Sequence, residues 1–442
     1  MSEAGWAPAL AICTGGAALT GAYARLAVRS LAPSGATLAD LAVVSGVFLV
    51  VLAGLAAWTR RGARPLPSSL ILGFAVLFHA IGLAGAPILE DDPARYRLDG
   101  WVFAERGSPY GIAPERFFDV DVPLDVEALL DEVNHPAIPT IYGPTLQWIF
   151  RGAHAVAGTA LWPIQAAMAL GSLALLWLVR RDASPLALAF LAWHPLWIKE
   201  FAFTAHPDAL AVALLLAAET VRRRNAIAAG GLLGLAVGAK LFAVLALPWI
   251  IGRAPRAALA FGATLAALYA PFLATLLAPS EAPDPHAAMG LAWIFNAPAH
   301  VLLTPILGTL GARGLLALGA LLFLGALLLR DARRGALGHA FPGQAVFGTM
   351  LFALPVLNPW YVIWPLAWWA RRPTAWLATA SVVVLASYAH GLHLEREGLD
   401  AYVVPLPVLA FETAAVAIAG LWDARRGPRR TGAARFDQSR SL

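Results

Sequence analysis

The chain has 442 residues, of which 59% are hydrophobic and only 13% are charged, and its mean hydropathy is +0.68. A soluble domain of this composition would expose far too much apolar surface, so a cytosolic globular enzyme and a disordered chain are both excluded. The net charge of +5 comes largely from short basic clusters beside apolar segments, which argues against nucleic-acid binding. The single cysteine, Cys13, allows no intrachain disulfide.

The apolar residues form continuous blocks of about 17–25 residues, the length that crosses a ~30 Å hydrocarbon core, and they lack the alternation of a β-barrel. The sequence therefore predicts an all-α polytopic membrane protein with a bundle of about 12–14 transmembrane helices. Two apolar stretches, 226–252 and 340–370, are each divided in two because this keeps the arginine clusters on one side. The expected helices lie near 7–28, 39–59, 69–88, 162–179, 185–203, 207–221, 226–239, 241–252, 257–277, 313–329, 340–357, 360–370, 374–392 and 403–422.

Charge predicts the orientation of these spans. Arginine clusters such as Arg180-Arg181 and Arg371-Arg372, with the tail after Trp422, belong in the cytoplasm by the positive-inside rule. The segment 90–135 has twelve acidic and four basic residues and belongs on the outer side. An even number of spans then places both termini inside. We expect a multi-pass protein of a bacterial inner membrane whose active site faces the periplasmic side.

One apolar segment, 141–158, contains Gln147, Arg151 and His154 and would invert every later arginine cluster if it crossed the membrane. We therefore expect it to form an amphipathic helix along the outer interface. The large outer loop then runs over 89–161.

The first polar constellation is Glu90-Asp91-Asp92, followed by Arg95, Tyr96 and Asp99. Carboxylates this close raise one another's pKa, so that one can act as a general base. The alternative is a solvated helix cap and charged loop.

The second constellation places Lys199, Glu200, His206 and Asp208 within ten residues of an otherwise apolar hairpin, at its outer turn. The alternative is a polar turn in which Asp208 caps a helix. Both constellations fall on the outer side by the charge argument, which favours one shared site.

Three further elements are weaker signals. His135 and Tyr142 lie in a proline- and glycine-rich entry to the interfacial helix, which is also ordinary loop punctuation. Trp360-Tyr361 is typical of an interfacial aromatic belt. Lys240 ends a glycine-rich helix and either reaches the outer surface or pairs with a lipid phosphate.

Together these residues resemble the C-type (GT-C) membrane glycosyltransferases, in the polyprenol-phosphate-mannose-dependent branch similar to glycosyltransferase family 87. The motifs lie in order over about 70–370. They are Glu90-Asp91-Asp92 with Arg95-Tyr96 and Asp99-Gly100, Asn134-His135-Pro136, Tyr142-Gly143-Pro144, Trp193 to Glu200 with His206 and Asp208, Lys240-Leu241-Phe242, Phe295-Asn296 and Pro359-Trp360-Tyr361. Leu98 stands where the branch usually has Trp.

The resemblance implies a GT-C-like bundle with interfacial helices in its first large outer loop. It divides the chain into an N-terminal transmembrane hairpin at 1–68, a catalytic core at 69–277, C-terminal transmembrane helices at 278–422 and a basic tail at 423–442.

It also implies an inverting transfer of a sugar, with mannose expected, from a polyprenyl-phosphate donor to a glycan or lipid-linked acceptor. Asp92, with Asp91 and Asp208, would be catalytic. The other candidate residues would bind substrate, and they are Arg95, Tyr96, Asp99, His135, Tyr142, Lys199, Glu200, His206, Lys240, Asn296, Trp360 and Tyr361. The resemblance assigns no definite cofactor, and a divalent cation between Asp91 or Asp92 and Asp208 is left open.

Two other classes stay open on the sequence. A lipid-linked saccharide flippase or secondary transporter should carry ionisable residues near the middle of the membrane, whereas here the acids concentrate on one outer surface. A non-catalytic scaffold would not need the intact acidic residues.

Overall fold

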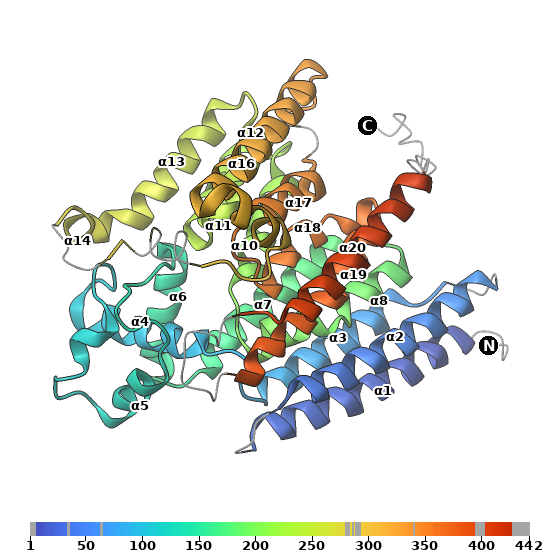
Figure 1. The fold of residues 1–442 in the computed structure, drawn as a ribbon, viewed down its shortest axis with the longest axis horizontal. Helices are drawn as coiled ribbons and strands as arrows, with labels where there is room; N and C mark the ends of the chain where they lie inside the picture. Colours follow the sequence, from blue (N-terminus) through green and yellow to red (C-terminus); the bar gives the residue numbers. More distant parts are fainter. Residues whose placement is uncertain are drawn as a thin grey trace.

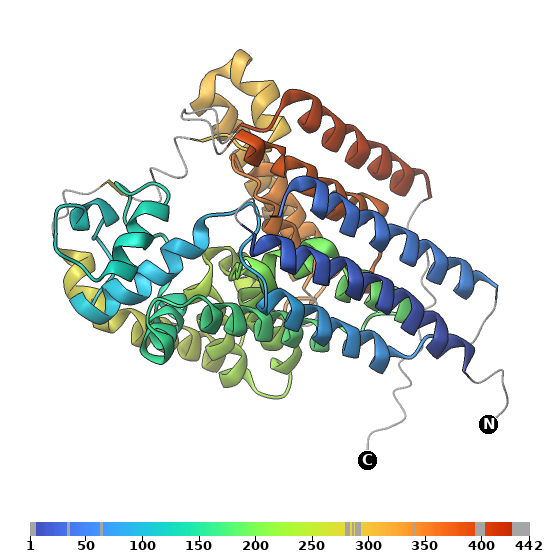
Figure 2. The ribbon, with the colours of Figure 1, turned by 90° about the horizontal axis from the view of Figure 1, so that it is seen from below.

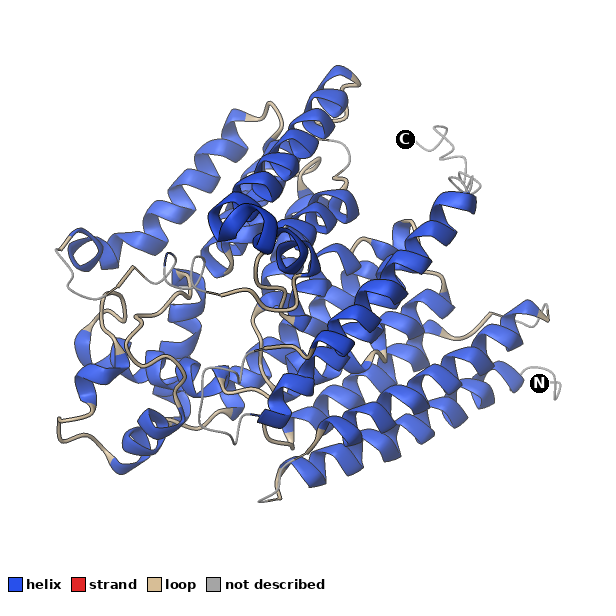
Figure 3. Ribbon diagram, in the orientation of Figure 1, coloured by secondary structure: helices blue, strands red, loops and turns tan. Residues whose placement is uncertain are grey.

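The computed structural model describes residues 6–32, 36–61, 65–278, 283–284, 287, 293–338, 341–393 and 403–426. Within these ranges the chain is helical and forms no strand beyond an isolated bridge between Phe295 and Val356 (Figure 3). This confirms the all-α prediction. The tail beyond residue 426 lies outside the described residues.

Six helical segments are long and apolar enough to cross a membrane, and a pair bent at residues 204–207 would add a seventh. Some expected spans are short, since fourteen residues of α-helix reach only about 21 Å against a hydrocarbon core of about 30 Å. The chain is thus a polytopic membrane protein, and the count of 12–14 spans stays a prediction. The long segments are α1 (Ala7–Ser30), α2 (Leu38–Arg60), α7 (Trp162–Val179), α13 (Pro255–Tyr269) continuing to Leu277 through α14 (Leu273–Leu277), α16 (Pro298–Arg333) and α20 (Leu406–Arg426), and the shorter apolar ones include α3 (Ser68–Leu83), α11 (Ala226–Ala239), α17 (Gly343–Ala353) and α19 (Ala375–Val383).

The expected continuous helix 185–203 is wrong. Helix α8 (Pro185–Ala192) ends just before Pro195, which has no N–H to continue the ladder. The chain resumes as the short α9 (Pro195–Ile198), turns through a π-helical segment at Lys199–Phe203, and bends by 106° into α10 (Asp208–Val221). The polar residues between 199 and 208 therefore lie inside the bundle and not in an exposed turn.

Both expected divisions of long apolar stretches are confirmed, but the second halves are not regular α-helices. Helix α11 ends at Ala239, and Lys240 has an extended backbone before a 3-10 segment, Leu241–Ala246, and α12 (Leu247–Ile251). After α17 the chain forms a 3-10 turn at Pro359–Val362, α18 (Ile363–Leu366) and another 3-10 turn at Trp369–Arg371. Prolines at 248, 359 and 365 interrupt these stretches.

The acidic loop folds into α4 (Asp92–Arg106), a 3-10 turn (Pro114–Phe117), α5 (Leu124–Glu132) and α6 (Pro144–Ala157). These elements gather at one end of the bundle, away from the chain termini (Figures 1 and 2). Helix α6 is the expected helix of 141–158, and its fourteen residues are too few to span. It packs so closely on α4 that a Cβ at Gly100 would lie 2.5 Å from the backbone oxygen of Phe150.

The bundle core is rich in aromatic side chains whose polar atoms are satisfied. The hydroxyl of Tyr23 on α1 donates to the backbone oxygen of Trp193, and the Trp193 indole donates to Ile71. Trp197 and His79 share the hydroxyl of Ser172. These contacts hold the N-terminal helices against the broken segment, residues 185–208, which carries the polar residues.

Candidate active site

Asp91 and Asp92 stand at the beginning of α4, where the partial positive charge of the helix N-terminus favours carboxylates. The Asn134 amide donates to Asp91 Oδ1 at 2.7 Å and to Asp92 Oδ1 at 3.3 Å. This links the acidic start of α4 to the loop after α5. The Asp92 side chain keeps 22% of its surface exposed.

Arg95, one turn further along α4, is buried and holds the same loop. Its guanidinium donates to the backbone oxygens of Ile138, Asn134 and His135 at 2.8, 2.9 and 3.0 Å. His135 has a φ of 47°, and its ring lies 4.2 Å from that of Trp293. Arg95, predicted to bind substrate, thus already bonds three carbonyl groups.

Asp99 connects α4 to α6 inside the loop domain. Its Oδ2 accepts hydrogen bonds from the Thr140 hydroxyl and, at 2.8 Å, from the Gln147 amide. Burial raises the pKa of the Asp99 carboxyl, while Arg95 and the two donors oppose that rise. Asp99 therefore joins α4 to Thr140 and to α6, and its side chain is buried.

Tyr96, His206 and Trp360 join Asp92 to the bundle. The Tyr96 hydroxyl lies 3.0 Å from His206 Nδ1 and 3.5 Å from Asp92 Oδ2. The His206 ring stacks on Trp360 at 3.7 Å, and Tyr142 meets Tyr96 edge-on at 5.0 Å. Trp360 is only 6% exposed, so it supports His206 and does not form a belt at the membrane surface.

A buried network continues from His206. Its Nε2 lies 3.5 Å from Glu200 Oε2, which also pairs with Lys199 at 3.1 Å. The Tyr388 hydroxyl donates to Glu200 Oε1 at 2.7 Å, and the Lys199 ammonium lies 3.8 Å from the Tyr388 ring centre. Buried charges are costly unless paired, and here each is met by hydrogen bonds or by opposite charge.

Asp208 and Lys240 form a second buried pair beside this network. The Lys240 ammonium lies 3.2 Å from Asp208 Oδ2, and the Trp364 indole donates to Asp208 Oδ1 at 2.7 Å. Asp208 therefore does not cap α10, which is how the sequence alternative placed it. Lys240 pairs with this carboxylate and lies 5.0 Å from the Tyr361 ring, and its expected contact with a lipid phosphate stays a prediction.

The structure brings most of the predicted residues into one group around Asp92, and these are Asp91, Tyr96, Tyr142, Lys199, Glu200, His206, Asp208, Lys240, Trp360 and Tyr361. Asn296 is buried near Glu412 of α20, outside the contacts that form this group. Tyr388 and Trp364 belong to the group and were missed, because each lies in an apolar stretch with no distinguishing motif. Their role depends on contacts with residues more than 150 positions away.

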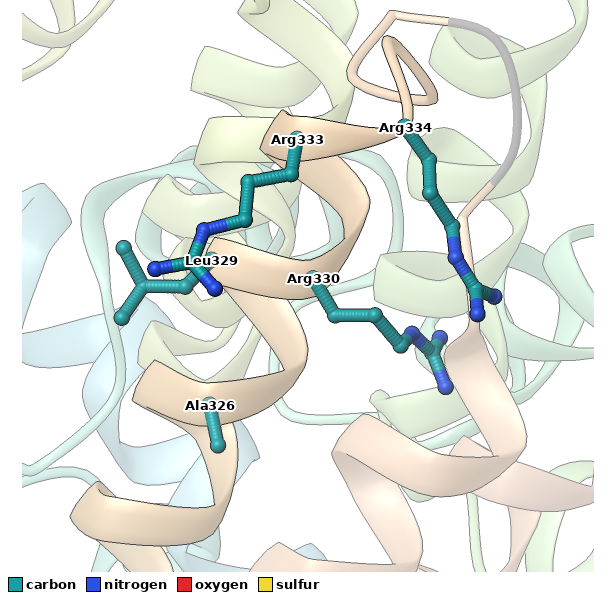
Figure 4. A pocket seen from close by; sticks show the side chains of 5 residues that line it. All are labelled: Ala326, Leu329, Arg330, Arg333 and Arg334. Carbon is teal, nitrogen blue, oxygen red and sulfur yellow. The ribbon is translucent and has the colours of Figure 1, made fainter.

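A divalent cation does not fit between Asp92 and Asp208, because Lys240 and Trp364 occupy both Asp208 oxygens. Among the described residues no three His, Cys, Asp or Glu side chains are arranged to hold a metal ion. Two surface pockets lie away from this group. One is lined by Ala326, Leu329, Arg330, Arg333 and Arg334 at the end of α16 (Figure 4), and the other includes Asp182, Glu219 and Arg371.

A comparison with protein-family models matches residues 4–256, more than half of the chain, to the MptA_B family, described as alpha-(1->6)-mannopyranosyltransferase, N-terminal domain. The matched range holds α4, the broken segment and Lys240, and so most of the group around Asp92. No curated protein and no solved structure matches the chain.

Proposed function

This chain belongs to the MptA_B family of alpha-(1->6)-mannopyranosyltransferases, and we propose that it transfers mannose from a polyprenyl-phosphate donor to an acceptor hydroxyl at the outer face of a bacterial inner membrane. The family match confirms the mannosyltransferase resemblance that the ordered motifs indicated. Membership in a mannosyltransferase family also argues against the flippase and scaffold alternatives.

The proposal rests chiefly on one difference between the carboxylates of the group. Glu200 and Asp208 are fully buried, and each of their oxygens accepts a hydrogen bond, at distances between 2.7 and 3.2 Å. Asp92 is partly exposed, and its contacts with Asn134, Tyr96 and His206 are all 3.3 Å or longer. A general base must reach the substrate and still have an oxygen free to take its proton. Asp92 best meets both conditions.

In the proposed step the acceptor oxygen attacks the anomeric carbon while its proton passes to Asp92. The bond from that carbon to the phosphate oxygen breaks, and polyprenyl phosphate leaves with the electron pair. A single displacement of this kind inverts the anomeric centre. Tyr96 and His206 would hold the Asp92 carboxylate, since both contact its Oδ2 side.

The location of the group supports an outer-face reaction with a lipid donor. The loop helices lie at the end of the bundle opposite the start of α1 and the end of α20 (Figure 2), and the charge pattern predicts that the chain termini face the cytoplasm. A donor whose tail stays in the membrane would present its sugar at the base of this loop. A polyprenyl chain also explains why a sugar-transfer site is built on so many apolar helices.

The test compares Asp92→Asn with wild type in proteoliposomes supplied with polyprenyl-phosphate mannose and candidate acceptors. We expect kcat to fall by about 10²-fold or more, because general base catalysis contributes about 10²–10⁴-fold. The anomeric configuration of the product, read by NMR, tests the inversion.

Asp131→Asn is the matched control, because Asp131 is an exposed acid on α5 of the same loop. It should keep the wild-type rate. Wild-type turnover in Asp92→Asn would refute Asp92 as the base, and a wild-type enzyme inactive with every polyprenyl-phosphate sugar would refute the donor.

A further inference from the structure

The leaving phosphate needs a cation, and four cationic side chains around the candidate active site are already engaged. Lys199 pairs with Glu200, and Lys240 pairs with Asp208. Arg95 donates to three backbone oxygens, and Arg97 donates to Thr159 and lies 3.6 Å from Glu132. Freeing any of them would leave a buried carboxylate or carbonyl without its donor, which is costly.

Arg313 on α16 differs from these residues. Its Nη2 donates to the backbone oxygen of Trp293 at 3.0 Å, while its Nε and Nη1 are buried and have no hydrogen-bond partner. No carboxylate within the described part of the chain pairs with it. An arginine of a membrane-spanning helix with unsatisfied N–H groups is a candidate ligand-binding residue.

Arg313 is connected to the candidate active site through two contacts. Its acceptor, Trp293, places its ring 4.2 Å from the ring of His135. The backbone oxygen of His135 in turn accepts from Arg95, one turn along α4 from Asp92. The guanidinium thus lies beside the loop that holds the proposed base.

Its depth along α16 suits a lipid headgroup. The helix is interrupted at Gly308, where φ is 70° and ψ is 166°, and Arg313 follows in the first turns of the second part. Arg333, near the other end, is twenty residues away, which corresponds to about 30 Å of helix. That is the thickness of the hydrocarbon core, so the two arginines lie at opposite headgroup levels if α16 spans the membrane.

The outer surface of α16 is apolar and open, whereas Arg313 lies toward the inner side of the helix with the buried Leu316 and Leu327. Leu310, Leu318, Leu321 and Leu322 expose 74%, 54%, 67% and 65% of their surface. Such a face suits acyl or prenyl chains, since it has no other apolar cover among the described residues.

We propose that Arg313 binds the phosphate of the donor lipid. This rests on the proposed function, because it assigns the donor-phosphate subsite of the same reaction. Nη2 stays on Trp293, while Nε and Nη1 each keep an N–H group that can donate to a phosphate oxygen.

The test measures binding of polyprenyl phosphate without sugar to protein in zwitterionic nanodiscs. Arg313→Gln should weaken the affinity about tenfold to a hundredfold, in line with hydrogen bonds from a charged group. Arg313→Lys, which keeps the charge and loses the planar guanidinium, should fall between the two. Uncharged polyprenol should bind equally to wild type and variants. Arg333→Gln is the matched control, on the same helix at its opposite end, and should leave the affinity unchanged.

Equal affinity of wild type, Arg313→Gln and Arg313→Lys for polyprenyl phosphate would overturn the proposal. The proposal would also be overturned if the Arg313 variants lost polyprenol binding as much as polyprenyl-phosphate binding. That result would mean that the substitution alters the structure of the binding site and not the recognition of the phosphate. If Arg313→Gln does not fold, the Lys variant decides by the same criterion. Loss of transfer in Asp92→Asn with unaltered binding in the Arg313 variants would refute this inference alone and leave the proposed function standing.

Discussion

Gly143 provides a steric test of how the site is held together. It precedes α6 with φ −71° and ψ 166°, a backbone conformation that alanine adopts freely. A Cβ there would nevertheless lie 2.2 Å from the backbone oxygen of Gly238 on α11, whereas ordinary contact begins at 3.4 Å. Gly143→Ala must therefore separate α6 from α11 by about 1 Å.

This separation acts on both halves of the active-site group. Tyr142 precedes Gly143 and contacts Tyr96, while Lys240 follows Gly238 by two residues and pairs with Asp208. Overpacking of this kind costs about 1–3 kcal/mol of stability. Displacing catalytic groups by about 1 Å lowers the rate about tenfold to a hundredfold. Thermal unfolding in detergent and mannosyl transfer in proteoliposomes measure the two effects.

Gly152→Ala is the control, because Gly152 lies on the same helix, is exposed and has nothing within 4 Å of an added Cβ. It should stabilise the protein by up to about 1 kcal/mol and leave transfer unchanged. If Gly143→Ala melts and turns over like Gly152→Ala, the contact between α6 and α11 does not hold the site, and the reasoning is refuted.

Two further predictions concern buried charges. Lys240→Met should lower the unfolding free energy by about 3 kcal/mol because it leaves Asp208 without its cation. Adding Asp208→Asn should restore most of this loss. If thermal unfolding shows that the two substitutions have strictly additive effects, the pairing is contradicted. Asp99 has a pKa raised by burial, so the folded state holds its proton longer than the unfolded state as pH rises above the ordinary value of 3.8. Stability from this group therefore falls from about pH 4 upward until the folded pKa is passed, and Asp99→Asn should gain on wild type over that range. Urea unfolding at pH 4 and pH 7 measures this, and parallel profiles for the two proteins would show that Asp99 does not titrate as described.

The sequence predicted the helices that depend on local composition. Long apolar runs such as α2 and α20 were expected close to their observed bounds, since a span needs little beyond length and hydropathy. The non-spanning helix α6 was also predicted, because a membrane crossing at this point would have placed every later arginine cluster on the outer side. The break in 185–203 was missed, although Pro195 marked it.

The sequence by itself determined that this chain is an all-α membrane protein with nearly half of its acidic residues on one loop, and ordered motifs indicated its family. Only the tertiary structure decided which polar residues meet. Lys240 and Asp208 are 32 positions apart, and Tyr388 and Glu200 are 188 apart, so no local pattern could pair them. The physical reason is that a buried charge is stable only beside its partner, and packing of distant helices sets that partner.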